Sequence, residues 1–119
     1  ALTARPGESP AEVAERLAAA GWGEAFVTGA DGRYLGTFTP VTAPGAATVG
    51  EAARTGGLTF DETTSLADAL QLMRGFIGEA IPVVDKASGR FLGVVSEADV
   101  VAAWLDESER LRREENASL

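Results

Sequence analysis

The residues whose types and spacing are best suited to bind a ligand are Ser96 and Asp99, in segment 93–99 (GVVSEAD). The serine follows two valines, as at the end of a strand, and the aspartate comes three positions later. Amides at a helix start attract anions, and an ionised aspartate accepts two hydrogen bonds from a vicinal diol. The pair could therefore hold the phosphate and ribose of a nucleotide. The same spacing is also a capping box, in which the two residues only begin a helix.

Composition restricts the chemistry that the chain can perform. It contains no histidine and no cysteine, which removes the commonest general base, the commonest metal ligand and every thiolate. We therefore expect no catalytic residue and no metal site. The adjacent acids Asp61 and Glu62 lie in a turn without partner groups for hydrolysis. A net charge of −8 repels nucleic acid polymers, which we do not expect as partners.

The 119 residues, 45% of them apolar, are enough for one compact module with a real core. No apolar run approaches the roughly 20 residues that cross a bilayer, and no signal peptide is visible. We therefore expect a cytoplasmic chain without direct membrane insertion. It begins at Ala1 rather than at a methionine, as an excised piece of a longer protein would.

The chain repeats itself. Segment 31–36 (DGRYLG) matches 88–93 (SGRFLG) at an offset of 57, and the apolar stretch 25–27 (AFV) matches 82–84 (PVV) at the same offset. Upstream, 9–12 (SPAE) matches 65–68 (SLAD) at an offset of 56, as does 2–3 with 58–59. We assign the one-residue difference to the loop after each helix. A tandem duplication therefore covers most of the chain.

Each copy predicts the order strand, helix, strand, strand, helix, an α/β fold. The first strands are expected at 2–4 and 58–60, and capping boxes at Ser9 and Ser65 open the first helices. Tight turns at 31–32 and 88–89 join the next two strands. The final helix of the second copy runs from about residue 97 past Trp104. In the first copy 43–45 (APG) stops the final helix, and a turn from Thr48 to about 56–57 replaces it.

This pattern resembles the tandem CBS domain pair, or Bateman module. The resemblance rests on 81–85 (IPVVD), 89–96 (GRFLGVVS) and Asp99, and more loosely on 26–27 and 32–36. It implies two β-α-β-β-α CBS repeats (α/β, or α+β) packed around a pseudo-twofold axis as one compact module. Repeat 1 would span 1–56 with its second helix truncated, and repeat 2 would span 57–119 with a charged C-terminal helix.

The resemblance also implies a nucleotide site. In nucleotide-binding members Ser96 would meet phosphate and Asp99 the ribose, with further contacts at Thr59, Ile81, Pro82 and Val83. The family favours a second hydroxyl before the aspartate, where this chain has Ala98, so one phosphate contact is missing. A degenerate first site would comprise Thr3, Thr39 and Thr42. The possible ligand is AMP, ADP or ATP, and no cofactor is required.

Two functions follow from the resemblance. Such modules usually form homodimers attached to an enzyme or membrane transporter, which they regulate. The leading hypothesis is a non-catalytic regulatory module that dimerises and senses an adenine nucleotide. Segments 99–105 and 110–115 resemble the end of the cytosolic CBS pair of bacterial chloride-channel-type anion transporters at the inner membrane. The alternative is therefore a purely structural dimerisation domain of such a transporter, without a ligand.

Three conspicuous side chains receive simpler interpretations. Trp104 lies at helical spacing from Val100 and Val101 and is predicted to be a core or dimer-contact residue. Arg33 and Arg90, each beside a turn glycine, are predicted to be solvated turn residues. Charges of both signs from 106 to 115 predict an exposed helix with pairs at i,i+4.

Overall fold

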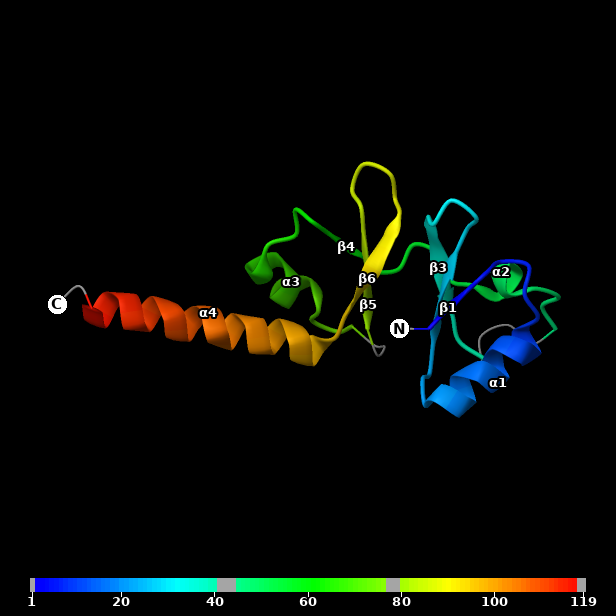
Figure 1. Cartoon of the computed structure of the whole chain (residues 1–119), viewed down its shortest axis with the longest axis horizontal. Coiled ribbons are helices and arrows are strands. Elements are labelled where there is room, and N and C mark those ends of the chain that lie inside the picture. The colour runs from blue at the N-terminus through cyan, green and yellow to red at the C-terminus, as the bar shows by residue number, and fades with distance from the viewer. Residues whose placement is uncertain (1, 41–44, 77–79, 118–119) are drawn as a thin grey trace.

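The computed structural model describes residues 2–40, 45–76 and 80–117. The proposed contact at Thr42 and the helix stop at 43–44 lie outside these residues. The first half of the chain contains β1 (Thr3–Ala4), α1 (Pro10–Ala20), β2 (Ala25–Thr28), β3 (Tyr34–Phe38) and α2 (Val49–Ala52). The second half contains β4 (Phe60–Asp61), α3 (Leu66–Leu72), β5 (Ile81–Val84), β6 (Phe91–Val95) and α4 (Glu97–Ala117) (Figure 1).

Each repeat builds one three-stranded sheet. The first has the order β1-β2-β3 and the second the order β4-β5-β6. In both, the outer two-residue strand pairs parallel to the middle strand, which pairs antiparallel to the third. The predicted βαββα order is confirmed in both copies. Helix α2 has only four residues and is followed by Ala53, so the substitute for the truncated helix is shorter than the sequence indicated.

The strand register corrects the alignment of the two copies. Val27 lies opposite Gly36 in the first hairpin, and Val83 lies opposite Gly93 in the second. The glycines are 57 residues apart, but the valines are 56 apart. The additional residue therefore lies in the second hairpin's loop, not in the loop after each first helix as we expected. Pro82 consequently corresponds to Phe26, and Ala80 to Glu24.

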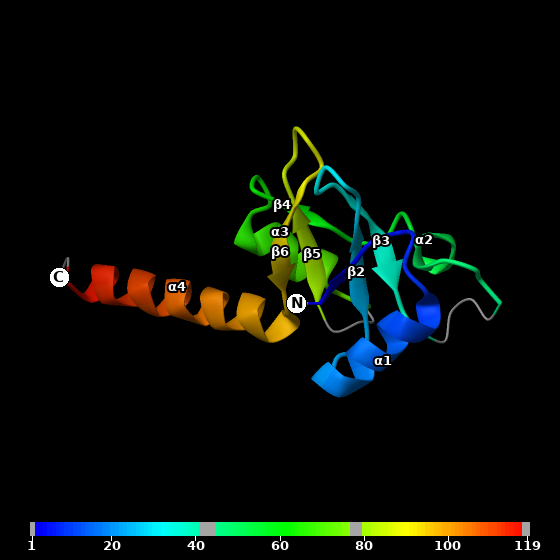
Figure 2. The same ribbon diagram turned by 45° about the vertical axis from the view of Figure 1, so that its right-hand side comes forward.

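The two repeats join where their hairpins meet, side by side in Figures 1 and 2. Arg33 and Arg90 form an antiparallel bridge. The Tyr34 amide donates to the carbonyl oxygen of Gly89 (3.0 Å), and the Phe91 amide donates to that of Gly32 (2.8 Å). Tyr34 corresponds to Phe91 and Gly32 to Gly89, so superposing one repeat on the other turns each of these hydrogen bonds into the other one. The bridge therefore lies on the pseudo-twofold axis. Both arginines are exposed, as predicted, but they also form this junction.

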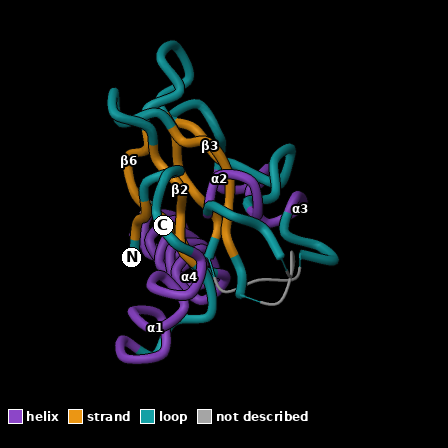
Figure 3. Tube along the Cα trace, turned by 90° about the vertical axis from the view of Figure 1, so that its right-hand side faces the viewer, coloured by secondary structure: helices purple, strands orange, loops and turns teal. Residues whose placement is uncertain are grey.

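Each repeat has its own hydrophobic core. The predicted apolar face of α1, Val13 and Leu17, is fully buried against the first sheet. In the second repeat Leu66 and Leu70 of α3 pack against a core that includes Ile81 and Val100. Viewed along the long axis, the strands lie at the centre, with α2 and α3 to one side of them (Figure 3).

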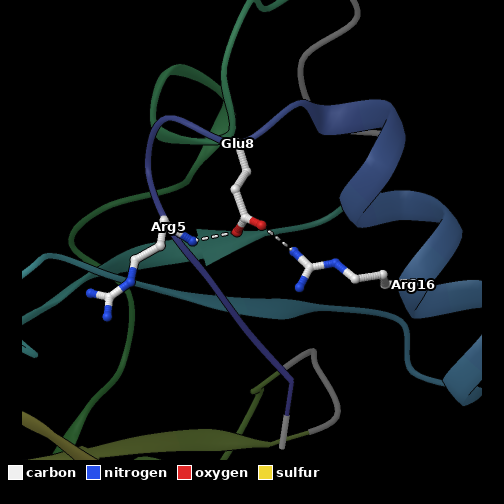
Figure 4. A network of polar contacts seen from close by, with 3 residues as sticks. All are labelled: Arg5, Glu8 and Arg16. Atoms are coloured by element: carbon white, nitrogen blue, oxygen red, sulfur yellow. Dashed lines mark hydrogen bonds and ion pairs between the residues drawn. The ribbon is translucent and has the colours of Figure 1, made fainter.

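The helix starts only partly follow the predicted capping boxes. Ser65 Oγ accepts the Asp68 amide at 3.1 Å, as expected. Ser9 occupies the N-cap of α1, but its side chain makes no capping bond, so that prediction is wrong. Instead the Glu8 carboxylate accepts the Arg5 amide at 2.6 Å and pairs with Arg16 at 2.8 Å (Figure 4). An acid one position earlier thus ties the chain entering α1 to the helix.

Helix α4 leaves the body of the molecule (Figure 1). The extents of the chain are 64 × 30 × 22 Å and its radius of gyration is 17.2 Å, against about 14 Å for a compact chain of this length. Trp104 is 46% exposed, so it is not a core residue. Arg110 pairs with Glu107, and Arg113 with Glu109 at i,i+4, which confirms the predicted charged, exposed helix.

Candidate functional site

Two cavities flank β5. Pro82 lines one of them and its neighbour Val83 lines the other. Because successive side chains of a strand point to opposite faces of the sheet, the cavities lie on opposite faces. We call them the inter-repeat cavity and the helix-side cavity.

The helix-side cavity lies between the second sheet, α3 and α4, and its volume is about 350 Å³. Its wall is mainly apolar and includes Phe60, Leu66, Val83 and Val100, with the carboxylate-bearing Asp99 among the lining residues. A wall of this kind offers few groups that could neutralise a phosphate.

The inter-repeat cavity, about 390 Å³ in volume, takes side chains from both repeats. Its lining includes Glu24, Tyr34, Thr37 and Arg54 from the first half of the chain, and Leu58, Phe76 and Pro82 from the second. Arg54 reaches it because the exit from α2 is held on β3: the Thr37 amide donates to the Arg54 carbonyl and the Arg54 amide donates to that of Thr37. The cavity thus combines a cation, a carboxylate, hydroxyl groups and apolar walls.

Burial and hydrogen bonding fix the polar side of this cavity. Glu24 is only 7% exposed, and its Oε1 accepts the Ala80 amide at 3.2 Å, which links the two repeats. The Tyr34 hydroxyl lies 2.6 Å from Thr37 Oγ1. Burial is the largest cause that raises the pKa of Tyr34, and the negative charge of Glu24 raises it further. The hydrogen bond to Thr37 and the positive charge of Arg54 lower this pKa, but the net shift is upward. Tyr34 is therefore a neutral hydrogen-bonding group at neutral pH.

Ser96 and Asp99 form a complete capping box at the start of α4. The Ser96 amide donates to Asp99 Oδ2 (3.0 Å), and the Asp99 amide donates to Ser96 Oγ (3.1 Å). The helix-start interpretation of this pair is thus realised in the structure. A ribose that used this carboxylate would have to compete with the Ser96 amide.

The other predicted site residues are divided between different surroundings. Val83 shares the helix-side cavity with Asp99, Pro82 lines the inter-repeat cavity, and Ile81 is fully buried in the core. Thr59 and Thr3 are exposed and Thr39 is half-buried, and none of these three is among the residues that line either cavity. The structure therefore does not bring the predicted set into one pocket.

The sequence analysis missed the polar residues of the inter-repeat cavity. Glu24 stands directly before a buried strand, an unusual place for an acid, and this signal could have identified it. Arg54 carries no comparable signal, since it follows a four-residue helix and depends on a long-range bridge to Thr37.

Three aspartates with lowered pKa values mark two turns and one helix start. The Thr63 hydroxyl and amide lower the pKa of Asp61, the Ser88 and Ala87 amides lower that of Asp85, and the Ser96 amide and then its hydroxyl lower that of Asp99. Asp61 accepts the Thr63 amide and Glu62 accepts the Lys86 amide. These are structural turn contacts.

Ser96→Ala is expected to raise the pKa of Asp99 only part of the way to its usual value, because the larger cause, the Ser96 amide, remains. A carboxyl whose folded pKa is lowered stabilises the fold above its unfolded pKa of about 3.9 and loses that effect as the pH falls through the folded value. Carboxyl-carbon NMR titration of wild type and variant measures both midpoints. An unchanged Asp99 midpoint would show that the hydroxyl bond is not formed in solution.

Comparison with known proteins identifies the family to which the chain belongs. Residues 49–106 match the CBS domain family model. A CBS-domain containing protein from Agrobacterium tumefaciens is 30% identical, with a TM-score of 0.64, over 86% of this chain and 87% of that one. The chain belongs to the CBS domain family. A comparison with curated protein sequences finds no significant match.

Further solved structures share the fold of this CBS pair. CBSX2, in complex with AMP, has a TM-score of 0.74 at 21% identity, over 89% of this chain and 88% of that one. The cytosolic domain of the Mg²⁺ channel MgtE, in complex with ATP, has a TM-score of 0.72 at 24% identity, over 86% of this chain and 44% of that one. Within the described part of this CBS pair, no helix is both long and apolar enough to cross a membrane.

Proposed function

We propose that this CBS pair is a non-catalytic regulatory module that binds an adenine nucleotide in the inter-repeat cavity. The observation that carries the proposal is the meeting of Arg54, Tyr34 and Thr37 with apolar side chains of the other repeat around one cavity. A ligand there contacts both repeats, so it favours one arrangement of them over others. That shift is the signal passed to an attached transporter or enzyme.

The chemistry of the walls fits the parts of a nucleotide. Leu58, Phe76 and Pro82 offer apolar surface to a base, and Arg54 offers a guanidinium to a phosphate. The volume falls within the usual range of small-molecule sites, about 300 to 1,000 Å³. The AMP bound to CBSX2 and the ATP bound to the MgtE domain support the choice of ligand class.

The site inferred from the sequence is the second candidate. It centres on Ser96 and Asp99, with Thr59, Ile81, Pro82 and Val83 around them, and its favouring observation is that Asp99 lines the helix-side cavity. Binding there requires the capping box to open, at a cost of about 1 kcal/mol. The degenerate counterpart at Thr3, Thr39 and Thr42 lacks the aspartate, so we expect it to contribute less.

Calorimetric titration with AMP, ADP and ATP distinguishes the two candidates. Arg54→Ala is expected to weaken binding about 10- to 100-fold, because a charge-assisted hydrogen bond contributes about 1.5 to 3 kcal/mol. Asp99→Ala should leave affinity within about twofold, and Arg74→Ala, an exposed arginine that lines neither cavity, should behave as wild type. The opposite ranking would place the nucleotide at Asp99. Absence of heat with all three nucleotides would support the purely structural alternative.

The host and the oligomeric state form the remaining part of the proposal. We propose a chloride-channel-type anion transporter as the host, with this module on its cytoplasmic side, on the resemblance of 99–105 and 110–115. We also propose that the chain dimerises through the α4 stripe, the exposed apolar residues Val101, Trp104, Leu105 and Leu111. A module that senses a nucleotide and a purely structural dimerisation domain would both form this dimer. Only the calorimetric titration with nucleotides distinguishes them.

A further inference from the structure

The junction between the repeats places two positive charges directly opposite each other. The bonds from Tyr34 to Gly89 and from Phe91 to Gly32 flank the Arg33–Arg90 bridge on both sides. This is the pattern of a non-hydrogen-bonded antiparallel pair, in which facing side chains are closest, with Cβ atoms about 4.5 to 5.5 Å apart. Like charges in this position destabilise a sheet.

Neither guanidinium forms an ion pair with a carboxylate of the described residues, and both side chains are exposed. Two aspartates lie nearby, but each is already engaged in its own turn. Asp31 Oδ1 accepts the backbone amide of Arg33 at 3.1 Å. Asp85, whose charge interacts with that of Arg90, accepts the amides of Ala87 and Ser88. Part of the repulsion between the two arginines therefore remains.

The two guanidinium groups are arranged symmetrically about the axis. Arg90 Nε lies 3.4 Å from the position that a Cβ would take on Gly32, and Arg33 Nε lies 3.4 Å from the matching position on Gly89. Both glycines have positive φ, 83° and 76°, which is why each turn is built on a residue without a side chain. Each arginine thus lies over the turn of the other repeat, and the pseudo-twofold axis passes between them.

We propose that Arg33 and Arg90 together bind one phosphoryl group on the pseudo-twofold axis. A guanidinium presents a planar fork of donors that matches phosphate oxygens, and two forks match a tetrahedral dianion. The bound charge removes the repulsion within the pair, so binding stabilises the contact between the hairpins. The ligand is inorganic phosphate or the phosphoryl group of a nucleotide. The site shares no residue with the inter-repeat cavity and does not depend on it.

Thermal unfolding at constant ionic strength tests the site, with phosphate compared against chloride. The wild-type melting temperature should rise by about 5 °C when phosphate is tenfold above its Kd. Arg33→Gln and Arg90→Gln should each lose this rise, and in chloride each should melt at or above wild type because the repulsion is gone. Arg33→Lys, which keeps the charge but not the fork, should lose most of the rise. The control Arg74→Gln should retain it.

Arms with AMP and ATP in place of phosphate identify the source of the phosphoryl group. A rise with nucleotide but not with phosphate, lost in Arg33→Gln and Arg90→Gln, assigns the site to a nucleotide. A rise kept in Arg54→Ala separates this site from the inter-repeat cavity. No rise with phosphate or either nucleotide, a rise kept in both glutamine variants, or a lower melting temperature of both variants in chloride overturns the proposal.

Discussion

Gly36→Ala is expected to lower the melting temperature by about 10 °C, a loss of about 3 kcal/mol of stability. A Cβ on Gly36 would lie 2.6 Å from the carbonyl oxygen of Arg54 and 3.2 Å from Ala53 Cβ. Because the first of these neighbours is backbone, no side-chain rotation relieves the clash. The segment after α2 would have to move off β3, and this would break the two backbone hydrogen bonds between Thr37 and Arg54.

Circular dichroism during thermal unfolding measures this effect. Gly7→Ala is the matched control, since nothing lies within 4 Å of its added methyl group, and it should melt close to wild type. The same displacement would carry Arg54 away from the inter-repeat cavity, so nucleotide affinity should fall with stability. A Gly36→Ala protein that melts within about 2 °C of wild type would show that the Ala53–Arg54 segment does not pack on β3.

The order of elements was predictable because it rests on local signals. Turn glycines, apolar runs and the repeat itself identify β2, β3, β5 and β6 without any knowledge of tertiary contacts. The register was not predictable. Both 82–84 (PVV) and 81–83 (IPV) are apolar, so hydrophobicity does not distinguish an offset of 57 from one of 56.

This single residue decides where a side chain points. A shift of one position exchanges the two faces of a strand, and Pro82 and Val83 consequently line different cavities. The same limit applies to the α4 stripe. Periodicity identifies Trp104 as part of an apolar face but does not say what covers that face. Among the described residues of one chain, the side chains of the stripe stay 40 to 55% exposed.

Charge on α4 favours a second copy as the partner of the stripe. From the middle of the helix onward, acidic residues (Asp106, Glu107, Glu109) are followed by arginines (Arg110, Arg112, Arg113) and then by Glu114 and Glu115. Two α4 helices packed antiparallel would set the acids of one copy against the arginines of the other, whereas parallel packing would set like charges together. These complementary charges would flank the apolar residues of the α4 stripe, which are exposed to water in a single chain.

Trp104→Glu is therefore expected to raise the dimer dissociation constant about 100-fold or more. Tryptophan at the centre of an interface commonly contributes 2 kcal/mol or more, and the added carboxylate would be buried twice, once in each copy. Sedimentation equilibrium over a range of concentrations measures the constant. The melting temperature of the variant monomer should change little, because Trp104 is exposed within one chain.

Ala102→Glu provides the comparison that isolates the stripe from net charge. Ala102 is exposed on the same helix. At 3.6 residues per turn it lies about 160° around the helix axis from Trp104, so the substitution adds the same negative charge on the side turned away from the tryptophan. It should leave the dimer within a few-fold of wild type, and rising salt should weaken both dimers because the flanking charges are screened. Equal dissociation constants for the two variants would mean that the copies meet elsewhere. A wild-type chain that stays monomeric at about 100 μM would remove α4 as a dimer contact, since an interface with a buried tryptophan hot spot should be tighter than that.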